Sequence, residues 1–599
     1  MRRSSNKAVV GGVVLALVAG AAIAQERPES ILPPGFNETT PPPPVDRAPP
    51  RAQPNPTAPG PTPLTPPLSP DESAELTDNS LADETAGTPA PVDPAALASY
   101  ELPSYARRSL DRVGIIGAAD GGLPANGFGT TQGRFLEVLM GRLNAPLPSR
   151  WLSIALRRTL ASQLDTPVGV NGADFAAERA WLLVRMGESQ VARAVVQAVD
   201  PDNFTPKLRE AAMQTALATG DPGLVCPVTD GALAGPQDRA WVLMAAICAG
   251  LSGVAGEGGR QIDAARKQGV ARGIDLLLAD KVVGTSSKRR AVTIEWDSVS
   301  QLTAWRYGLA TATATEIPEP LFATVAPRVQ FWRAQAPMLD ARARAGAAEL
   351  AAAQGVLSST ALIDLFGEID EAEEGSSAEA GVARDLRSAY SENDRAQRIA
   401  AMTRLWDEPR GPRGQYARLV LTSQAVGALP PASDAEADRL IASMLSAGIE
   451  GRAARWRSLV STGGDGWAML TLADRFGGTL GRGDVRRYGG GARGDTQRKR
   501  QMFFAALAGL GRVDPSAMES LAGDLGVDLT RDNSWTRAID RAAGRGEPAT
   551  VVLLAAVGMQ TANWHGVSAD ALYRIIAAFH RVGLDAEARM IAVEALTRL

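Results

Sequence analysis

The 599-residue chain has little of what most enzymes use for nucleophilic or metal chemistry. It contains two histidines, His565 and His580, and two cysteines, Cys226 and Cys248. A zinc site needs three or four ligands, and neither pair has a third ligand at a metal-binding spacing. The sequence also lacks a Gly-x-Ser-x-Gly elbow and a Gly-x4-Gly-Lys-Ser/Thr phosphate loop. We therefore expect no catalytic residue, no metal ligand and no cofactor.

The chain also lacks an excess of one charge and is poor in aromatic residues. Its 62 basic and 66 acidic residues leave a net charge of −4. A nucleic-acid-binding protein usually carries a strong basic footprint, so no nucleic-acid partner is expected. Aromatic residues make up 5% of the chain, whereas Ala and Gly are plentiful. Because strands favour β-branched and aromatic residues and small side chains suit packed helices, the composition predicts an all-α fold.

A long apolar run, Ala8–Ala24, follows the basic segment Met1–Lys7. The run ends in Ala-Ile-Ala, the small-x-small pattern that signal peptidase cuts, so residues 1–24 are expected to be a cleaved signal peptide. At 17 residues the run is at the lower limit for a membrane span, and its retention as an anchor is the alternative. We expect export to the periplasm or another extracytoplasmic space of a bacterium, with membrane contact only through an uncleaved signal segment.

Export bears on the two cysteines, because disulfides form in oxidising compartments. One disulfide between Cys226 and Cys248 is therefore expected, and two buried free thiols are the alternative. The helical pattern places Cys226 at the start of a short helix and Cys248 near the end of the next, at about 237–251. These ends lie side by side in an antiparallel helix pair, which favours the disulfide.

Proline is concentrated near the N-terminus, where 20 of the 40 prolines lie between Gln25 and Pro94. Proline fixes φ and lacks a backbone donor, so such a stretch favours extended polyproline II. We expect residues 25–98 to form a disordered Pro-rich spacer. It either holds the rest of the chain away from a membrane or wall, or binds a groove on a partner, or is a tether without a specific partner.

From about residue 100, apolar residues recur at helical spacing and Gly, Pro or Asp interrupts every 10–20 residues. Ala577–Leu596 shows the pattern most fully. Gly583 stands five residues before Ala588, and a second small residue, Ala595, follows seven positions later. Glycine ends a helix with a tight turn, and alanine lets the next helix pack closely against the first. Trp181–Pro201 follows the same pattern in part.

This Gly-x4-Ala pattern resembles the turn and second helix of a tetratricopeptide repeat. The 34-residue period of that family does not persist along the chain. The resemblance implies an irregular α-solenoid of helical hairpins, an architecture that presents extended surfaces to proteins, peptides or polymers. A compact all-α fold without repeats is the alternative.

Two polar stretches interrupt the helical part. Residues 368–380 carry six carboxylates, which predicts an exposed acidic loop between a first helical block, 99–367, and a second, 381–599. Within the second block, residues 481–500 contain seven Arg or Lys and six Gly, which predicts a mobile basic loop. Arginine suits bidentate contacts with phosphate or carboxylate, so this loop is a candidate anion- or partner-binding site. Its cations are Arg486, Arg487, Arg493, Arg498, Lys499 and Arg500. A flexible, solubilising insertion is the alternative.

Together these features favour an exported helical scaffold that binds an envelope protein or an anionic polymer and performs no catalysis. One alternative is an enzyme that acts on cell-wall or surface polysaccharide with carboxylates alone. Its candidate residues are Glu295 and Asp297, which flank Trp296, and Asp407 and Glu408, which follow Trp406. Solvated charges on helix faces are the alternative for these acids. A further alternative for the whole chain is a structural or adhesive protein displayed on the cell surface.

Overall fold

The computed structural model describes residues 104–234, 238–285, 292–372, 376–489 and 496–599. The expected signal peptide and Pro-rich spacer lie outside them. Within the described residues 67% are helical and 2% lie in strands, which confirms an all-α fold. Contacts divide the chain into two units. Only residues 104–107 of the second are described, with a 3-10 turn η1 at Ser104–Ala106, and the other described residues, from Arg108 to Leu599, belong to the first.

The first unit opens with a short antiparallel strand pair, in which β1 (Arg112–Val113) joins β2 (Leu164–Asp165). Side-chain oxygens of Ser149, Asn171 and Thr205 cap the helices that begin after them. The elements of this part are η2 (Ala118–Asp120), α2 (Gly133–Arg142), α3 (Arg150–Ala161), α4 (Gly172–Met186), α5 (Ser189–Gln197), η3 (Pro201–Asn203) and α6 (Pro206–Thr219).

A buried arginine joins the strand pair to the end of α3. The guanidinium of Arg179, on α4, donates to the carbonyl oxygens of Leu160 (2.8 Å), Val113 (2.7 Å) and Ser162 (2.6 Å). Burial lowers the pKa of Arg179 to about 10. The last carbonyls of a helix lack intrahelical partners and carry the negative end of its dipole, so they are suitable acceptors for a buried cation.

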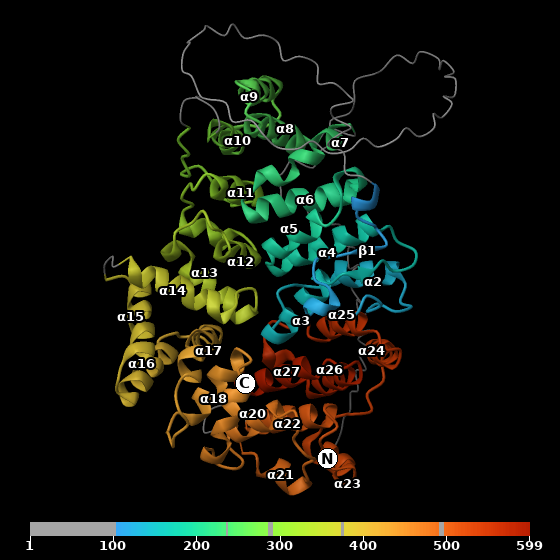
Figure 1. The fold of residues 1–599 in the computed structure, drawn as a ribbon, viewed down its shortest axis with the longest axis vertical. Coiled ribbons are helices and arrows are strands. Elements are labelled where there is room, and N and C mark those ends of the chain that lie inside the picture. Colours follow the sequence, from blue (N-terminus) through green and yellow to red (C-terminus); the bar gives the residue numbers. More distant parts are fainter. Residues whose placement is uncertain (1–103, 235–237, 286–291, 373–375, 490–495) are drawn as a thin grey trace, which may run out of the picture. The chain divides into compact units, whose positions relative to one another are not determined.

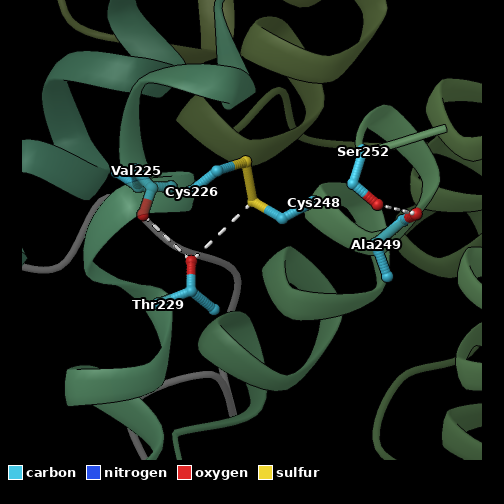
Figure 2. Close-up of a disulfide and its surroundings, with 6 residues drawn as sticks. All are labelled: Val225, Cys226, Thr229, Cys248, Ala249 and Ser252. Carbon is cyan, nitrogen blue, oxygen red and sulfur yellow. Dashed lines mark hydrogen bonds between the residues drawn. A yellow bond between two sulfur atoms is a disulfide. The ribbon is translucent and has the colours of Figure 1, made fainter. Parts of the chain in front are cut away.

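A disulfide joins two elements in the next part of the chain (Figure 2). Cys226 lies within the 3-10 helix η4 (Pro222–Val228), and Cys248 lies near the end of α8 (Arg239–Leu251), with their Cα atoms 5.4 Å apart. Cys226 is therefore inside its short helix and not at its start. The neighbouring helices are α7 (Thr229–Leu233), α9 (Glu257–Gln268), α10 (Gly273–Thr285) and α11 (Ala304–Ala312).

The middle of the chain continues with helices that pack on their neighbours in sequence. These are η5 (Glu319–Thr324), α12 (Arg328–Ala334), α13 (Ala341–Gln354), α14 (Ser359–Glu371), α15 (Ala378–Ser391), α16 (Arg395–Asp407) and α17 (Pro412–Gly427). The alanines of α13 let α14 and α17 approach it, and the three helices share a core with Phe366 and Leu421. The expected acidic loop is much shorter than 368–380, because α14 continues through Glu371 and α15 begins at Ala378. Residues 373–375 lie outside the described part.

The last part is also helical. Its elements are α18 (Ala437–Ser446), α19 (Glu450–Ala453), η6 (Ala454–Leu459), α20 (Asp465–Ala473), α21 (Arg482–Arg487), α22 (Thr496–Gly509), α23 (Pro515–Leu525), α24 (Ser534–Gly544), α25 (Pro548–Gly558), η7 (Trp564–Gly566), α26 (Ala569–Arg581) and α27 (Asp585–Thr597). The segment expected as one mobile loop, 481–500, differs from that expectation, since α21 and the start of α22 occupy both its ends. Residues 490–495 are outside the described range.

The glycines of the repeated pattern end helices as expected. Gly187 has φ +89° between α4 and α5, and Gly583 has φ +78° between α26 and α27. A side chain is strained at such angles, whereas glycine is not. In both places the two flanking helices pack against each other, so each glycine turns the chain into a helical hairpin.

The ends of the first unit meet, although more than 400 residues separate them. Helices α25 and α27 pack on α3 (Figure 1). The carboxylate of Glu594, on α27, is 1% exposed and accepts from Ser149 Oγ (2.6 Å), Arg150 N (2.8 Å) and Trp151 N (3.2 Å). An acid from the last helix thus occupies the electropositive N-terminus of α3.

A second buried acid repeats this arrangement beside α25. Glu547, 1% exposed, precedes α25 and accepts from Thr130 N at 3.0 Å and Thr131 Oγ1 at 2.6 Å. Two carboxylates therefore join the C-terminal helices to the start of the unit.

Among the helices of the described ranges, none is long and apolar enough to cross a membrane.

Candidate functional site

The candidate site is a cleft of about 570 Å³ among α16, α17, α18, α20 and the end of α27. Its lining runs from Trp406 on α16 to Leu599, the last residue of the chain. Lys499 of α22 and His565 of η7 contribute as well. Ligand pockets in proteins commonly enclose about 300–1,000 Å³, so the cleft is large enough for a peptide segment or a short saccharide.

One part of the cleft lining is built on a tryptophan and an arginine. Trp406 is 1% exposed, and its indole N–H donates to Thr422 Oγ1 at 2.8 Å. The Arg439 guanidinium lies 4.7 Å from the Trp406 ring centroid and pairs with Asp407 at 2.8 Å and Glu436 at 3.3 Å. A guanidinium over an aromatic face is held by the ring quadrupole, so this part of the lining combines a fixed cation with an exposed carboxylate.

A second part of the lining has the same construction. The Arg598 guanidinium lies 4.7 Å from the centroid of Tyr416 and pairs with Glu594 at 3.0 Å. The hydroxyl of Tyr416 is buried, and no residue of the described ranges forms a hydrogen bond with it. Burial, and secondly the charge of Glu594, raises the pKa of Tyr416, so the phenol stays neutral. The carboxylate that caps α3 therefore also fixes one side of the cleft.

Two aspartates lie together in the cleft in different environments. Asp465 accepts from Tyr488 Oη at 2.8 Å and Lys499 Nζ at 2.9 Å. Asp438 accepts from the backbone N–H of Gly466 at 3.0 Å. Burial raises the pKa of Asp438, and the charge of Asp465 raises it further. One acid is held by a lysine and the other is pushed toward its protonated form, a combination used in general acid–base catalysis.

The six cations predicted as one binding loop do not form one. Lys499 is 6% exposed and paired inside the cleft, and Arg500 donates to Tyr488 O at 2.8 Å. Arg498 donates to the carbonyl of Val567. These three side chains turn inward because α22 begins at Thr496 and directs them at neighbouring elements.

The other three cations lie elsewhere. Arg486 and Arg487 are on α21, with side chains 55% and 56% exposed, and pair with Asp524 and Asp484. Arg493 is outside the described residues. The basic stretch is thus divided between an exposed helix and a buried network.

The carboxylates named as enzyme candidates are also separated. Asp407 lines the cleft, whereas Glu408 pairs with Arg418 at 2.9 Å. Glu295 and Asp297 are exposed in the segment before α11. Of the two histidines, His565 lines the cleft and His580 pairs with Asp585 on the next helix.

Sequence reasoning missed most of the cleft, including Asp438, Asp465, Tyr416 and Arg598. The Gly-Gly-Asp-Gly run at 463–466 is a local signal for a helix start at Asp465. Nothing in the sequence indicates that Asp438 caps that helix. These contacts join segments far apart in the chain, which spacing along the sequence does not reveal.

A buried ion pair outside the cleft also escaped the sequence analysis. Glu188, at the start of α5, is 1% exposed, and Arg157 Nη1 lies 3.1 Å from its carboxylate. Burial raises the pKa of Glu188 to about 7, although the charge of Arg157 acts in the opposite direction. Arg157 also donates to Gly355 O at 2.7 Å, so the pair links α3, α5 and the end of α13.

Across the described ranges, no group of three or more His, Cys, Asp or Glu side chains is placed to hold a metal ion. Comparisons with known protein families, with curated proteins and with solved structures gave no match.

Proposed function

We propose that the chain is an exported α-helical scaffold of the bacterial cell envelope. Its architecture is an irregular, tetratricopeptide-like solenoid, and its cleft binds a segment of a protein or polymer. The observation that carries the proposal is the pair of arginine–aromatic contacts, Arg439 with Trp406 and Arg598 with Tyr416, in one cleft of about 570 Å³. Ordered aromatic and arginine side chains are typical anchors of binding sites.

The charges of the cleft favour a polypeptide over a strongly anionic polymer. Its cations Arg439, Lys499 and Arg598 are already paired with carboxylates. The side chain of Asp407 is 57% exposed and that of Glu436 is 31% exposed, so both are accessible to cations and amides of a ligand. A peptide supplies donors and acceptors of both kinds, whereas a polyanion meets repulsion from the cleft's acids.

Two observations support an extracytoplasmic location. The sequence begins with the pattern of a signal peptide, and Cys226 and Cys248 are joined in a disulfide. Structural disulfides are uncommon in a reducing cytoplasm. The packing of each helix from α12 to α16 on the next supports the solenoid part of the proposal, whereas α17 also packs back on α13.

Site-specific photo-crosslinking in the producing bacterium tests the proposal. A photoreactive residue replaces Gln415, which lines the cleft, and a strong crosslink to one envelope protein is expected. The substitution Arg439→Gln should remove that crosslink. The matched control is Arg404→Gln, which removes an exposed arginine of α16 that pairs with Asp385. A crosslink unaffected by Arg439→Gln, or absent altogether, would contradict the proposal.

The pair Asp438 and Asp465 favours a second candidate, a carboxylate-dependent enzyme acting on cell-wall polysaccharide. Burial raises the pKa of Asp438, which is the direction that a general acid requires, and Asp465 is the neighbouring carboxylate. The test is turnover of purified peptidoglycan by the full chain. Turnover that is abolished by Asp438→Asn while the fold is retained would replace the scaffold proposal with the enzyme.

A further inference from the structure

The loop between α20 and α21, residues 474–481, presents an aromatic side chain to solvent. Phe476 is 81% exposed. The loop around it is held by defined hydrogen bonds. Asp474 Oδ1 accepts from Phe476 N at 2.9 Å, and Arg512 Nη1 donates to Thr471 O at 2.6 Å and Asp474 O at 3.2 Å. Leu480 N donates to Arg512 O at 2.9 Å. The exposed ring is thus fixed on an ordered support.

One arginine contacts this ring, and three others follow it along the chain. The Arg475 guanidinium lies 4.3 Å from the Phe476 centroid. On α21, directly after the loop, the side chains of Arg482, Arg486 and Arg487 are 45%, 55% and 56% exposed. We call Phe476, Arg475 and these three arginines the Phe476 surface.

The Phe476 surface keeps an excess of positive charge. Arg482 and Arg486 share one carboxylate, that of Asp524, at 2.6 and 2.7 Å, and Arg487 pairs with Asp484 at 3.2 Å. Asp474, in the loop itself, pairs with Arg457 at 3.0 Å, so the four arginines of the surface and Arg457 lie beside three acids. Each guanidinium has five N–H donors, so an exposed one can donate to a further, external anion while it keeps its carboxylate partner.

We infer that the Phe476 surface docks the chain on an anionic phospholipid membrane. Arginines pair with lipid phosphates, and a neighbouring aromatic ring gains by leaving water for the membrane interface. A soluble anionic polymer would use the arginines but gains nothing from an exposed phenyl ring, so the ring favours the membrane. None of the residues of the Phe476 surface lines the cleft, and the inference does not depend on the proposed function.

The test is flotation of the purified full chain with vesicles of phosphatidylcholine alone or mixed with phosphatidylglycerol. We expect binding only to the vesicles that contain phosphatidylglycerol. Phe476→Ser should weaken it roughly tenfold, as expected when one large apolar side chain loses its burial. The matched control is Phe135→Ser, which removes a ring that is 43% exposed on α2 and should leave binding unchanged. The double variant Arg486→Gln/Arg487→Gln should bind more weakly and with less dependence on salt.

Three results would overturn the inference. The first is equal binding to phosphatidylcholine alone, and the second is wild-type affinity of Phe476→Ser for the mixed vesicles. The third is binding of polyglutamate that depends on Arg486 and Arg487 but not on Phe476, which would assign the surface to an anionic polymer. Circular dichroism of each variant separates loss of binding from loss of fold.

Discussion

Replacing Glu594 by glutamine tests whether one buried acid joins the two ends of the unit. Its Oε2 accepts from Ser149 Oγ and Trp151 N, and its Oε1 accepts from Arg150 N and Arg598 Nη1, at 2.6–3.2 Å. Glutamine keeps the size of the side chain but turns one oxygen into an NH2 group. If Oε1 becomes the NH2 group, Arg150 N and Arg598 Nη1 face a donor. If Oε2 becomes it, Trp151 N faces a donor, whereas the Ser149 hydroxyl can turn and accept. At least one backbone donor therefore loses its acceptor.

The expected loss of stability follows from that count. A buried donor without an acceptor costs on the order of 1–3 kcal/mol, and loss of a charge at a helix N-terminus adds about 0.3–1 kcal/mol. We expect Glu594→Gln to lower the free energy of unfolding by about 3 kcal/mol. The unfolding entropy of a unit of roughly 490 residues is about 1 kcal/mol/K, so the corresponding fall in Tm is only about 3 °C. Denaturant titration is therefore the better assay.

The measurement is urea unfolding of the full chain, followed by the helical circular dichroism signal. The control is Asp585→Asn on the same helix, a side chain that is 47% exposed, for which a change below about 1 kcal/mol is expected. If Glu594→Gln unfolds within about 0.5 kcal/mol of the wild type, the donors at the start of α3 have other acceptors and the reasoning fails.

Three further predictions concern stability. Because the pKa of Glu188 is raised to about 7 in the folded chain from 4.5, folding favours its protonated form. The wild type should therefore lose stability as the pH rises from about 5 to 8, and Glu188→Gln should remove that loss in denaturant midpoints measured across this range. Gly308→Ala should lower the free energy of unfolding by about 1–3 kcal/mol, because the new Cβ would lie 2.6 Å from a backbone oxygen of α6. Gly346 has open space around its Cα, so the control Gly346→Ala should leave that free energy unchanged or raise it by up to ~1 kcal/mol. Cys226→Ala/Cys248→Ala, which opens a loop with a sequence separation of 22, should lower the free energy of unfolding by ~3 kcal/mol, and an unchanged urea midpoint would contradict this.

Local patterns predicted the local structure well. The i, i+3, i+4 and i+7 spacing indicated helices, and Gly187 and Gly583 end helices with positive φ. The structure of the Arg/Gly-rich stretch 481–500 was harder to predict, because its arginines favour a helix whereas its glycines disfavour one. Its ends are helical since Val485 and Met502, buried with 0% exposure, anchor α21 and α22 in the core. Burial by neighbouring helices thus overrode local composition.

The cleft was only partly accessible to sequence reasoning. Asp407 was a candidate because it follows Trp406, and both line the cleft. The pairing of Asp438 with Gly466, 28 positions away, and of Lys499 with Asp465, 34 positions away, depends on how α18, α20 and α22 come together. Neither pair has a spacing typical of a motif, so no pattern in the sequence marks them.

By itself the sequence determined the helical class, the helix-ending glycines Gly187 and Gly583, and the pair of cysteines available for a disulfide. Each depends on composition or on residues within one or two helical turns of one another. Only the tertiary structure decided that Glu594 caps a helix 443–445 positions away, that Arg598 covers Tyr416 beside the cleft, and that Phe476 stays in solvent. Such contacts are set by the packing of whole helices, whose free energy is distributed over many side chains and leaves no short pattern in the sequence.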